Sequence, residues 1–184
     1  MSITRTGRAH LDVPCTDIDL TAWIFGLSDA EYQACARGHR AAGVFADEEG
    51  RGTVNVEAIG GNLVIQHYRA VRTERDGVEM HSAASRVYLL HLVPVTATVG
   101  WWLAAAPTGA ATSELTCTVE VGLHPVVQAL GRLMALGTFL RRHVEEETQL
   151  FAADIERKTR RTRTGSVTTS SISSGPDPRR SGAS

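Results

Sequence analysis

One long helical pattern occupies the second half of this chain, and an acidic residue lies on its apolar side. The pattern runs over residues 123–156. At about 100° per residue, its apolar stripe comprises the side chains within about 40° of Leu140, namely Val126, Leu133, Val144 and Phe151. Glu147 lies about 20° from Leu140 and therefore faces the same way. An unpaired carboxylate on a core face costs several kcal/mol, so Glu147 requires a cationic partner, a proton or a metal ion.

His143 lies one helical turn before Glu147, on the flank of the same stripe. A histidine and a glutamate at this spacing place an imidazole nitrogen and a carboxylate oxygen on one side of a helix, where both can bind one ion. The same spacing also arises by chance. The pair alone therefore leaves a metal site, a buried ion pair and a protonated acid as alternatives.

The segments before this helix have the pattern of an antiparallel sheet. Ser28 and Glu31 form a capping-box motif that predicts a short helix over 29–37, ending near His39. Strand-like segments follow at 53–59, 63–72, 78–93, 96–105 and 114–121, separated by turn residues. A short helix, about five antiparallel strands and a long final helix predict an α+β helix-grip fold of the Bet v1/START type, in which the curved sheet wraps around the helix.

Composition limits the classes of protein to which the chain can belong. It has 184 residues, of which 42% are hydrophobic and 21% charged, as expected for one globular domain. No apolar run reaches the roughly 18 residues of a membrane span, and the first residues lack a signal-peptide core. The three cysteines, Cys15, Cys35 and Cys117, fit neither a disulfide framework nor a cysteine zinc site. We expect a soluble cytoplasmic protein with three free thiols.

The last part of the chain differs from the rest in charge and composition. Residues 157–184 contain seven basic residues and one acidic residue, whereas the first 156 residues carry a formal net charge of −7. This segment is rich in Ser, Thr and Gly and has few side chains to bury. We therefore predict a helix-grip domain over 1–157 and a disordered basic tail over 158–184. No aromatic residue is interleaved with the basic ones, so we expect no nucleic-acid partner.

Several segments of the sequence are similar to those of a known family. The run His143-Val144-Glu145-Glu146-Glu147 resembles the zinc-binding helix of the diacetylphloroglucinol hydrolase family, which includes phloretin hydrolases. The likeness extends over 22–155. It includes an N-terminal stretch, Trp23-Ile24-Phe25-Gly26 with Glu31-Tyr32 and Gly38-His39, and a strand before a turn, Val56-Glu57-Ala58-Ile59-Gly60-Gly61. Members of this family have a helix-grip domain and use zinc to cleave a carbon–carbon bond between an acyl group and a phenolic ring.

The resemblance implies a set of four metal ligands: His39, Glu57, His143 and Glu147. Two imidazoles and two carboxylates suit zinc with room for water or a substrate oxygen. Two of these assignments have alternatives. His39 is also a suitable residue to end a helix, and Glu57 shares its strand with Val54, Val56 and Ala58 on the opposite face. Glu57 reaches a cavity only if the polar face of the strand is the concave one.

The sequence also contains candidate catalytic residues, and we take His67, Tyr68 and Tyr88 as groups that could return a proton to the substrate. Trp101 and Trp102 are either core aromatics or walls of a ligand cavity. The resulting hypothesis is a zinc-dependent hydrolase of carbon–carbon bonds that acts on an aromatic acyl-phenol or polyketide-like small molecule between sheet and helix. The alternative is a metal-free helix-grip polyketide cyclase or hydrophobic-ligand carrier. Exposed strand edges would permit a homodimer.

Overall fold

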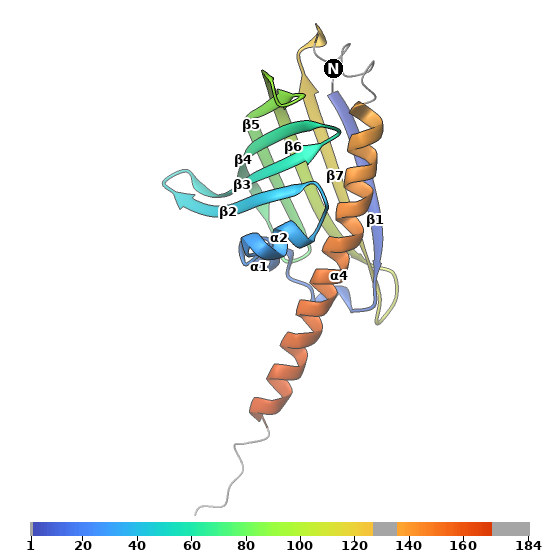
Figure 1. Cartoon of the computed structure of the whole chain (residues 1–184). Coiled ribbons are helices and arrows are strands. Elements are labelled where there is room, and N and C mark those ends of the chain that lie inside the picture. Colours follow the sequence, from blue (N-terminus) through green and yellow to red (C-terminus); the bar gives the residue numbers. More distant parts are fainter. Residues whose placement is uncertain (1, 127–135, 171–184) are drawn as a thin grey trace, which may run out of the picture.

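Seven antiparallel strands and one long helix make up most of the structure, a computed structural model that describes residues 2–126 and 136–170 (Figure 1). The strands are β1 (Ser2–Leu11), β2 (His39–Asp47), β3 (Gly50–Ile59), β4 (Asn62–Thr73), β5 (Gly77–Leu89), β6 (Val93–Pro107) and β7 (Ser113–Leu123). The helices are the 3₁₀ turn η1 (Cys15–Asp17), α1 (Leu20–Phe25), α2 (Asp29–Ala34) and α4 (Leu136–Ser170). The order of strands in the sheet is β1-β7-β6-β5-β4-β3-β2. This arrangement confirms the predicted α+β helix-grip fold of the START/Bet v1 type.

The prediction of about five strands was too low, because it missed β1 and β2. β1 pairs with β7, more than a hundred residues later in the chain, so no local hairpin signal marks it. β2 is an edge strand in which most residues are exposed or only partly buried, so it lacks the alternation that identifies a strand with one buried face. The turn predicted between the strand segments 53–59 and 63–72 is confirmed at Gly60 and Gly61, while Asn62 already belongs to β4. Gly60 and Gly61 have φ angles of 57° and 79°, the left-handed region that favours glycine.

The capping box is confirmed. The Ser28 side chain accepts a hydrogen bond from the Glu31 backbone, and the Glu31 carboxylate accepts one from the Ser28 backbone. The helix is shorter than the 29–37 predicted, because Cys35 is its C-cap and the chain then turns into β2 at His39. The Glu31 carboxylate also forms an ion pair with the Lys158 ammonium group, at 2.9 Å, which connects α2 to the final helix.

The final helix ends later in the chain than predicted, and the first residue of the predicted helical segment belongs to β7. β7 continues to Leu123, Val126 is 71% exposed, and the predicted stripe residue Leu133 lies outside the described residues. α4 continues to Ser170, so it extends past the predicted domain boundary at residue 157. Ion pairs one turn apart support this extension, among them Arg160 with Glu156 at 2.7 Å. Of the predicted tail, 171–184 lies outside the described residues.

The concave face of the sheet and α4 enclose the core. α4 packs across β1 and β7 and reaches β3, while α1 and α2 cover the other end of the sheet (Figure 1). Phe151 of α4 is fully buried, and its ring contacts Trp23 edge-on with centroids 4.8 Å apart. The Trp23 indole donates a hydrogen bond of 2.9 Å to the buried Asp154. These contacts fix the position of α4 along the sheet.

No helix in the described ranges is both long and apolar enough to cross a membrane.

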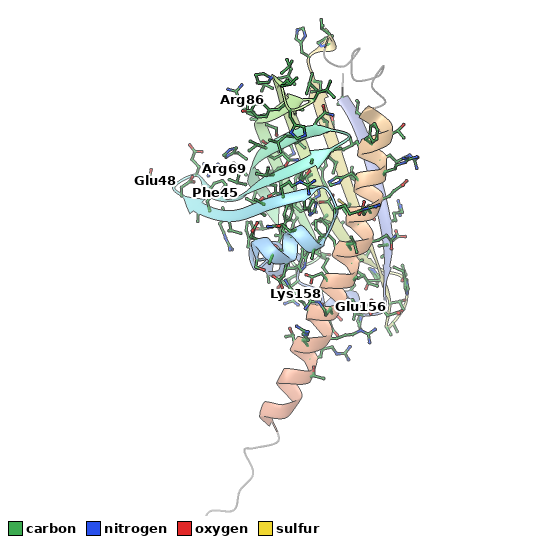
Figure 2. The ribbon with its side chains drawn as sticks, in the orientation of Figure 1. Phe45, Glu48, Arg69, Arg86, Glu156 and Lys158 are labelled. Atoms are coloured by element: carbon green, nitrogen blue, oxygen red, sulfur yellow. The ribbon has the colours of Figure 1, made fainter. Side chains whose placement is uncertain are left out.

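The β2–β3 hairpin projects from the side of the sheet (Figure 2). Arg69 of β4 holds its outer end, since the guanidinium bonds both carboxylate oxygens of Asp47 and stacks over the Phe45 ring at 4.9 Å. The inner end of the same hairpin carries His39 and Glu57, which are paired in the strand register.

Candidate metal centre

The four side chains implied by the family resemblance lie together in the structure. His39 is the first residue of β2 and lies opposite Glu57 of β3, while His143 and Glu147 lie one turn apart on α4. All four are buried, with exposed fractions of 3–9%. One ligand atom from each lies within 4.8 Å of the others. The sheet therefore contributes one imidazole and one carboxylate, and the helix contributes the other pair.

Glu57 points inward because the polar face of β3 is the concave one. Its inward neighbours along the strand are Thr53, Asn55 and Ile59, all buried, whereas Val54, Val56 and Ala58 are only partly buried. The alternative in which Glu57 lies on the outer face is therefore excluded. The alternative in which His39 ends a helix is also excluded, because His39 is the first residue of strand β2.

Two of the distances between candidate ligand atoms match those found around a bound zinc ion. His39 Nε2 lies 3.5 Å from Glu147 Oε1, and His143 Nε2 lies 3.5 Å from Glu57 Oε2. Four ligands at about 2.0–2.2 Å from a tetrahedral zinc ion are themselves about 3.3–3.6 Å apart. Both Nε2 atoms are buried, and neither has a hydrogen-bond partner among the described residues. Buried polar atoms are rarely left without a partner, so the cluster could hold a metal ion.

Surrounding groups orient the candidate ligands. His39 Nδ1 lies 2.7 Å from the Tyr32 carbonyl oxygen, which can only accept, so Nδ1 carries a proton and Nε2 faces the centre of the cluster. The Tyr32 hydroxyl donates to Glu57 Oε1 at 2.5 Å, and Gln66 Nε2 donates to Glu57 Oε2 at 3.3 Å. Gly38 leaves room for the His143 ring, since a Cβ there would lie 3.1 Å from two ring atoms. Support of this kind is typical of metal-binding histidines and carboxylates.

Without an ion, the cluster would hold its own charges as pairs. Burial opposes ionisation of Glu57, but the neighbouring His143 and His39 outweigh it and lower the pKa of Glu57 to about 2. Burial likewise opposes the charge on His143, but Glu57 outweighs it and raises the pKa of His143 to about 9. The pKa of His39 is raised for the same reason, with Glu147 as its main partner. A metal cation would replace these protons, since both imidazoles bind metals in the neutral form.

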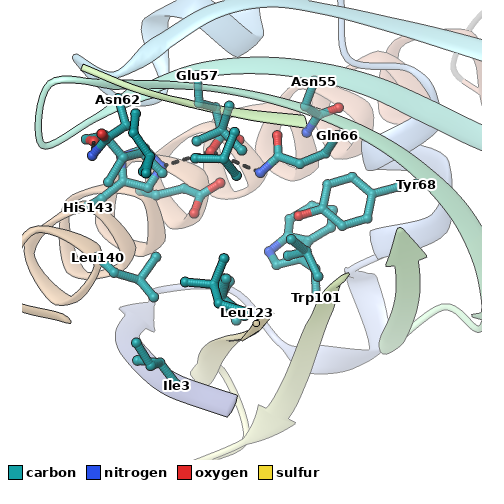
Figure 3. A pocket seen from close by; sticks show the side chains of 18 residues that line it. Ile3, Asn55, Glu57, Asn62, Gln66, Tyr68, Trp101, Leu123, Leu140 and His143 are labelled. Atoms are coloured by element: carbon teal, nitrogen blue, oxygen red, sulfur yellow. Dashed lines mark hydrogen bonds and ion pairs between the residues drawn. The ribbon is translucent and has the colours of Figure 1, made fainter. Parts of the chain in front are cut away.

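A cavity adjoins the cluster between the sheet and α4 (Figure 3). The space open to the centres of water molecules is about 60 Å³, several times the roughly 10–15 Å³ that one water needs. Glu57, His143 and Glu147 form part of its wall. Asn55, Gln66 and Tyr68 lie on one side, and apolar side chains lie on the other, among them Ile3, Leu123 and Leu140 (Figure 3). The cavity therefore suits a molecule with one polar edge next to the cluster.

Of the three predicted catalytic residues, only Tyr68 lines the cavity. Tyr68 is 3% exposed and lines the cavity, and burial raises the pKa of its hydroxyl well above the usual range. His67 is exposed on the opposite face of β4, and Tyr88 is partly buried outside the cavity wall. Alternation along a strand explains this outcome, because neighbours of an inward residue point outward. The cavity residues Asn55 and Gln66 were not predicted, although each lies two residues from an inward one.

Comparisons with known proteins define the fold. No family model matches the sequence, and no curated protein matches it significantly. A conserved protein from Geobacillus kaustophilus superposes with a TM-score of 0.59 and 12% identity, covering 84% of this chain and 96% of that chain. A protein from Thermus thermophilus gives 0.54 and 12%, covering 83% and 96%. The di-domain ARO/CYC BexL from the BE-7585A biosynthetic pathway gives 0.50 and 15%, covering 84% of this chain and 50% of that one. At these identities the likeness shows a common helix-grip fold.

Proposed function

We propose that this protein is a zinc-dependent hydrolase that cleaves a carbon–carbon bond in an acyl-phenol or polyketide-like ketone. The observation that carries the proposal is the convergence of His39, Glu57, His143 and Glu147, with two buried Nε2 atoms that lack a hydrogen-bond partner. The resemblance to diacetylphloroglucinol hydrolases supports the same four residues as ligands. An adjoining cavity with one polar and one apolar side supports a small aromatic substrate.

A zinc ion held by these residues would polarise a ketone oxygen and make a water molecule more acidic. In the overall reaction, water adds to the acyl carbonyl carbon and the bond from that carbon to the ring breaks. The electron pair moves to the ring and is delocalised onto its oxygen substituents, and a proton returns to the ring carbon. The products are a carboxylic acid and a phenol.

Tyr68 is the group that we assign to proton return. Its hydroxyl faces the cavity on the same side as Gln66, which bonds the candidate ligand Glu57 (Figure 3). A tyrosine hydroxyl is protonated at neutral pH, and burial raises the pKa of this one further, so Tyr68 holds a proton that the ring carbon can take up. The exposed His67 cannot serve this role, because it lies on the other face of the sheet.

A metal-free cyclase or ligand carrier is the second candidate. It is favoured by the two His–carboxylate pairs at 3.5 Å, which balance charge within the cluster. The fold is also shared with an ARO/CYC protein. This candidate predicts binding of aromatic ligands that does not respond to chelators.

The test is hydrolysis of 2′,4′,6′-trihydroxyacetophenone, followed by chromatography of acetate and the released phenol. Wild-type protein supplied with zinc should form both products, and Glu147→Gln should lose zinc and activity together because the carboxylate is a ligand. A Glu147→Gln protein that keeps its zinc and its activity would contradict the assignment. Ligand binding without turnover, unchanged by chelators, would favour the second candidate.

A further inference from the structure

Two neighbouring amide side chains on the cavity wall have hydrogen-bonding groups that the protein does not use. Asn55 of β3 and Gln66 of β4 are direct partners in the strand register, and both line the cavity. Both are 4% exposed. Asn55 makes no side-chain hydrogen bond with any part of the chain that the structure describes, whereas the Gln66 amide donates one to Glu57 and also lies beside the Tyr68 hydroxyl.

The orientation of the Gln66 amide follows from its contact with Glu57. An ionised carboxylate only accepts hydrogen bonds, so the Gln66 NH₂ group faces Glu57 Oε2 and its carbonyl oxygen points away. That oxygen, Oε1, is buried and has no partner within the described ranges. Leaving a buried acceptor without a donor is unfavourable, so this oxygen favours a donor supplied by a ligand or a water molecule in the cavity.

We propose that Asn55 and Gln66 together bind a hydroxyl group of the ligand, beside the group held at the His39/Glu57/His143/Glu147 cluster. A hydroxyl donates one hydrogen bond and accepts others, which matches the Gln66 Oε1 acceptor and the Asn55 NH₂ donor. An ether oxygen only accepts, and a ring hydrogen does neither. The pair therefore selects aryl ketones that carry a ring hydroxyl over their methyl ethers and over the unsubstituted ketone.

The inference rests on the proposed function for the ketone group of the ligand, and it assigns a binding site to a ring hydroxyl next to that group. Figure 3 shows Asn55 and Gln66 on the same side of the cavity as Glu57, with Leu140 and Leu123 across from them. A flat ring between these walls would have its oxygen substituents along the β3–β4 edge and its carbon edge against the apolar wall. Trp101 also lines the cavity, so its fluorescence reports on binding.

The experiment measures the Kd of 2′,4′,6′-trihydroxyacetophenone, its trimethyl ether and acetophenone by tryptophan quenching, in zinc-supplied and chelator-treated protein. Wild type should bind the hydroxylated ketone at least about 10-fold more tightly than either counterpart. Asn55→Leu and Gln66→Met should reduce this preference to within about threefold, because they keep the size of the side chain and remove its polar atoms.

Thr53→Val is the matched control. Thr53 is the next inward residue of β3 and is buried, but it does not line the cavity, so the preference should be unchanged. Equal preference in wild type, Asn55→Leu and Gln66→Met would overturn the inference, as would the absence of saturable binding by wild type. Zinc content of the same samples tests the proposed function separately. A zinc-loaded wild type without the hydroxyl preference would leave the metal proposal standing and refute this one.

Discussion

The Tyr32 hydroxyl provides a clean test of how the cluster is held. Tyr32→Phe removes the 2.5 Å hydrogen bond to Glu57 Oε1. It keeps the backbone carbonyl that bonds His39 Nδ1 and the ring that stacks on His39 at 3.9 Å. A hydrogen bond to a charged group contributes about 1.5–3 kcal/mol. Loss of such support typically weakens metal binding by about 10- to 100-fold.

The assay is competition for zinc with a chromophoric chelator, together with thermal unfolding of the zinc-free protein. Tyr32→Phe should weaken zinc binding by about 10- to 100-fold. It should lower the melting temperature of the zinc-free protein by about 3–12 °C. Tyr68→Phe is the control, since Tyr68 is also a buried tyrosine but no hydrogen bond joins its hydroxyl to any of the four candidate ligands, all of which the structure describes. A zinc dissociation constant of Tyr32→Phe within about threefold of wild type would contradict the claim that this hydrogen bond positions Glu57 as a zinc ligand.

Three further substitutions test the surroundings of the site. Gly38→Ala should weaken zinc binding by about 10-fold or more, because its Cβ would lie 2.8 Å from the Ala58 carbonyl oxygen and 3.1 Å from the His143 ring. Gly43→Ala, with nothing within 4 Å of its Cβ, should leave zinc binding unchanged in the same titration. Phe151→Ala should lower the free energy of unfolding by about 3–5 kcal/mol in urea denaturation, because the ring is fully buried; a loss under about 1 kcal/mol would contradict the packing described. The pKa of Glu31 is lowered to about 2 by its backbone hydrogen bond in the capping box and its lysine partner, so its stabilising effect is complete above its ordinary pKa of 4.5 and is lost as pH falls toward 2. The difference in melting temperature between wild type and Glu31→Gln should therefore shrink below about pH 4.5. A difference that grows as pH falls would contradict the lowered pKa of Glu31.

The candidate ligands on the helix were predictable because their geometry is local. A helix fixes which residues share a face, so Glu147 on the apolar stripe, with His143 one turn before it, follows from sequence spacing alone. The structure buries both residues as expected. His39 and Glu57 were assigned only through the family resemblance, because their proximity depends on how β2 pairs with β3. Strand pairing between an edge strand and its neighbour leaves little trace in the sequence of the edge strand.

The missed features depend on contacts between distant parts of the chain. β1 crosses α4 closely at Gly7, where a Cβ would lie 2.8 Å from the Val144 carbonyl oxygen. A small residue at such a crossing carries no strand signal. Asn55 and Gln66 resemble surface residues in sequence, because alternation divides a strand into two faces without showing which face is inward. Glu57 as an inward residue would have identified Asn55, two positions earlier, as a cavity residue.

Metal content measured by elemental analysis tests the central claim most directly. The protein is purified with zinc supplied, beside a His143→Ala/Glu147→Ala variant that removes the two helical members of the cluster. We predict about one zinc ion per wild-type chain and none in the variant, with the fold of both confirmed by circular dichroism. A folded wild-type protein without zinc, or a variant that retains it, would contradict a metal centre at these four residues.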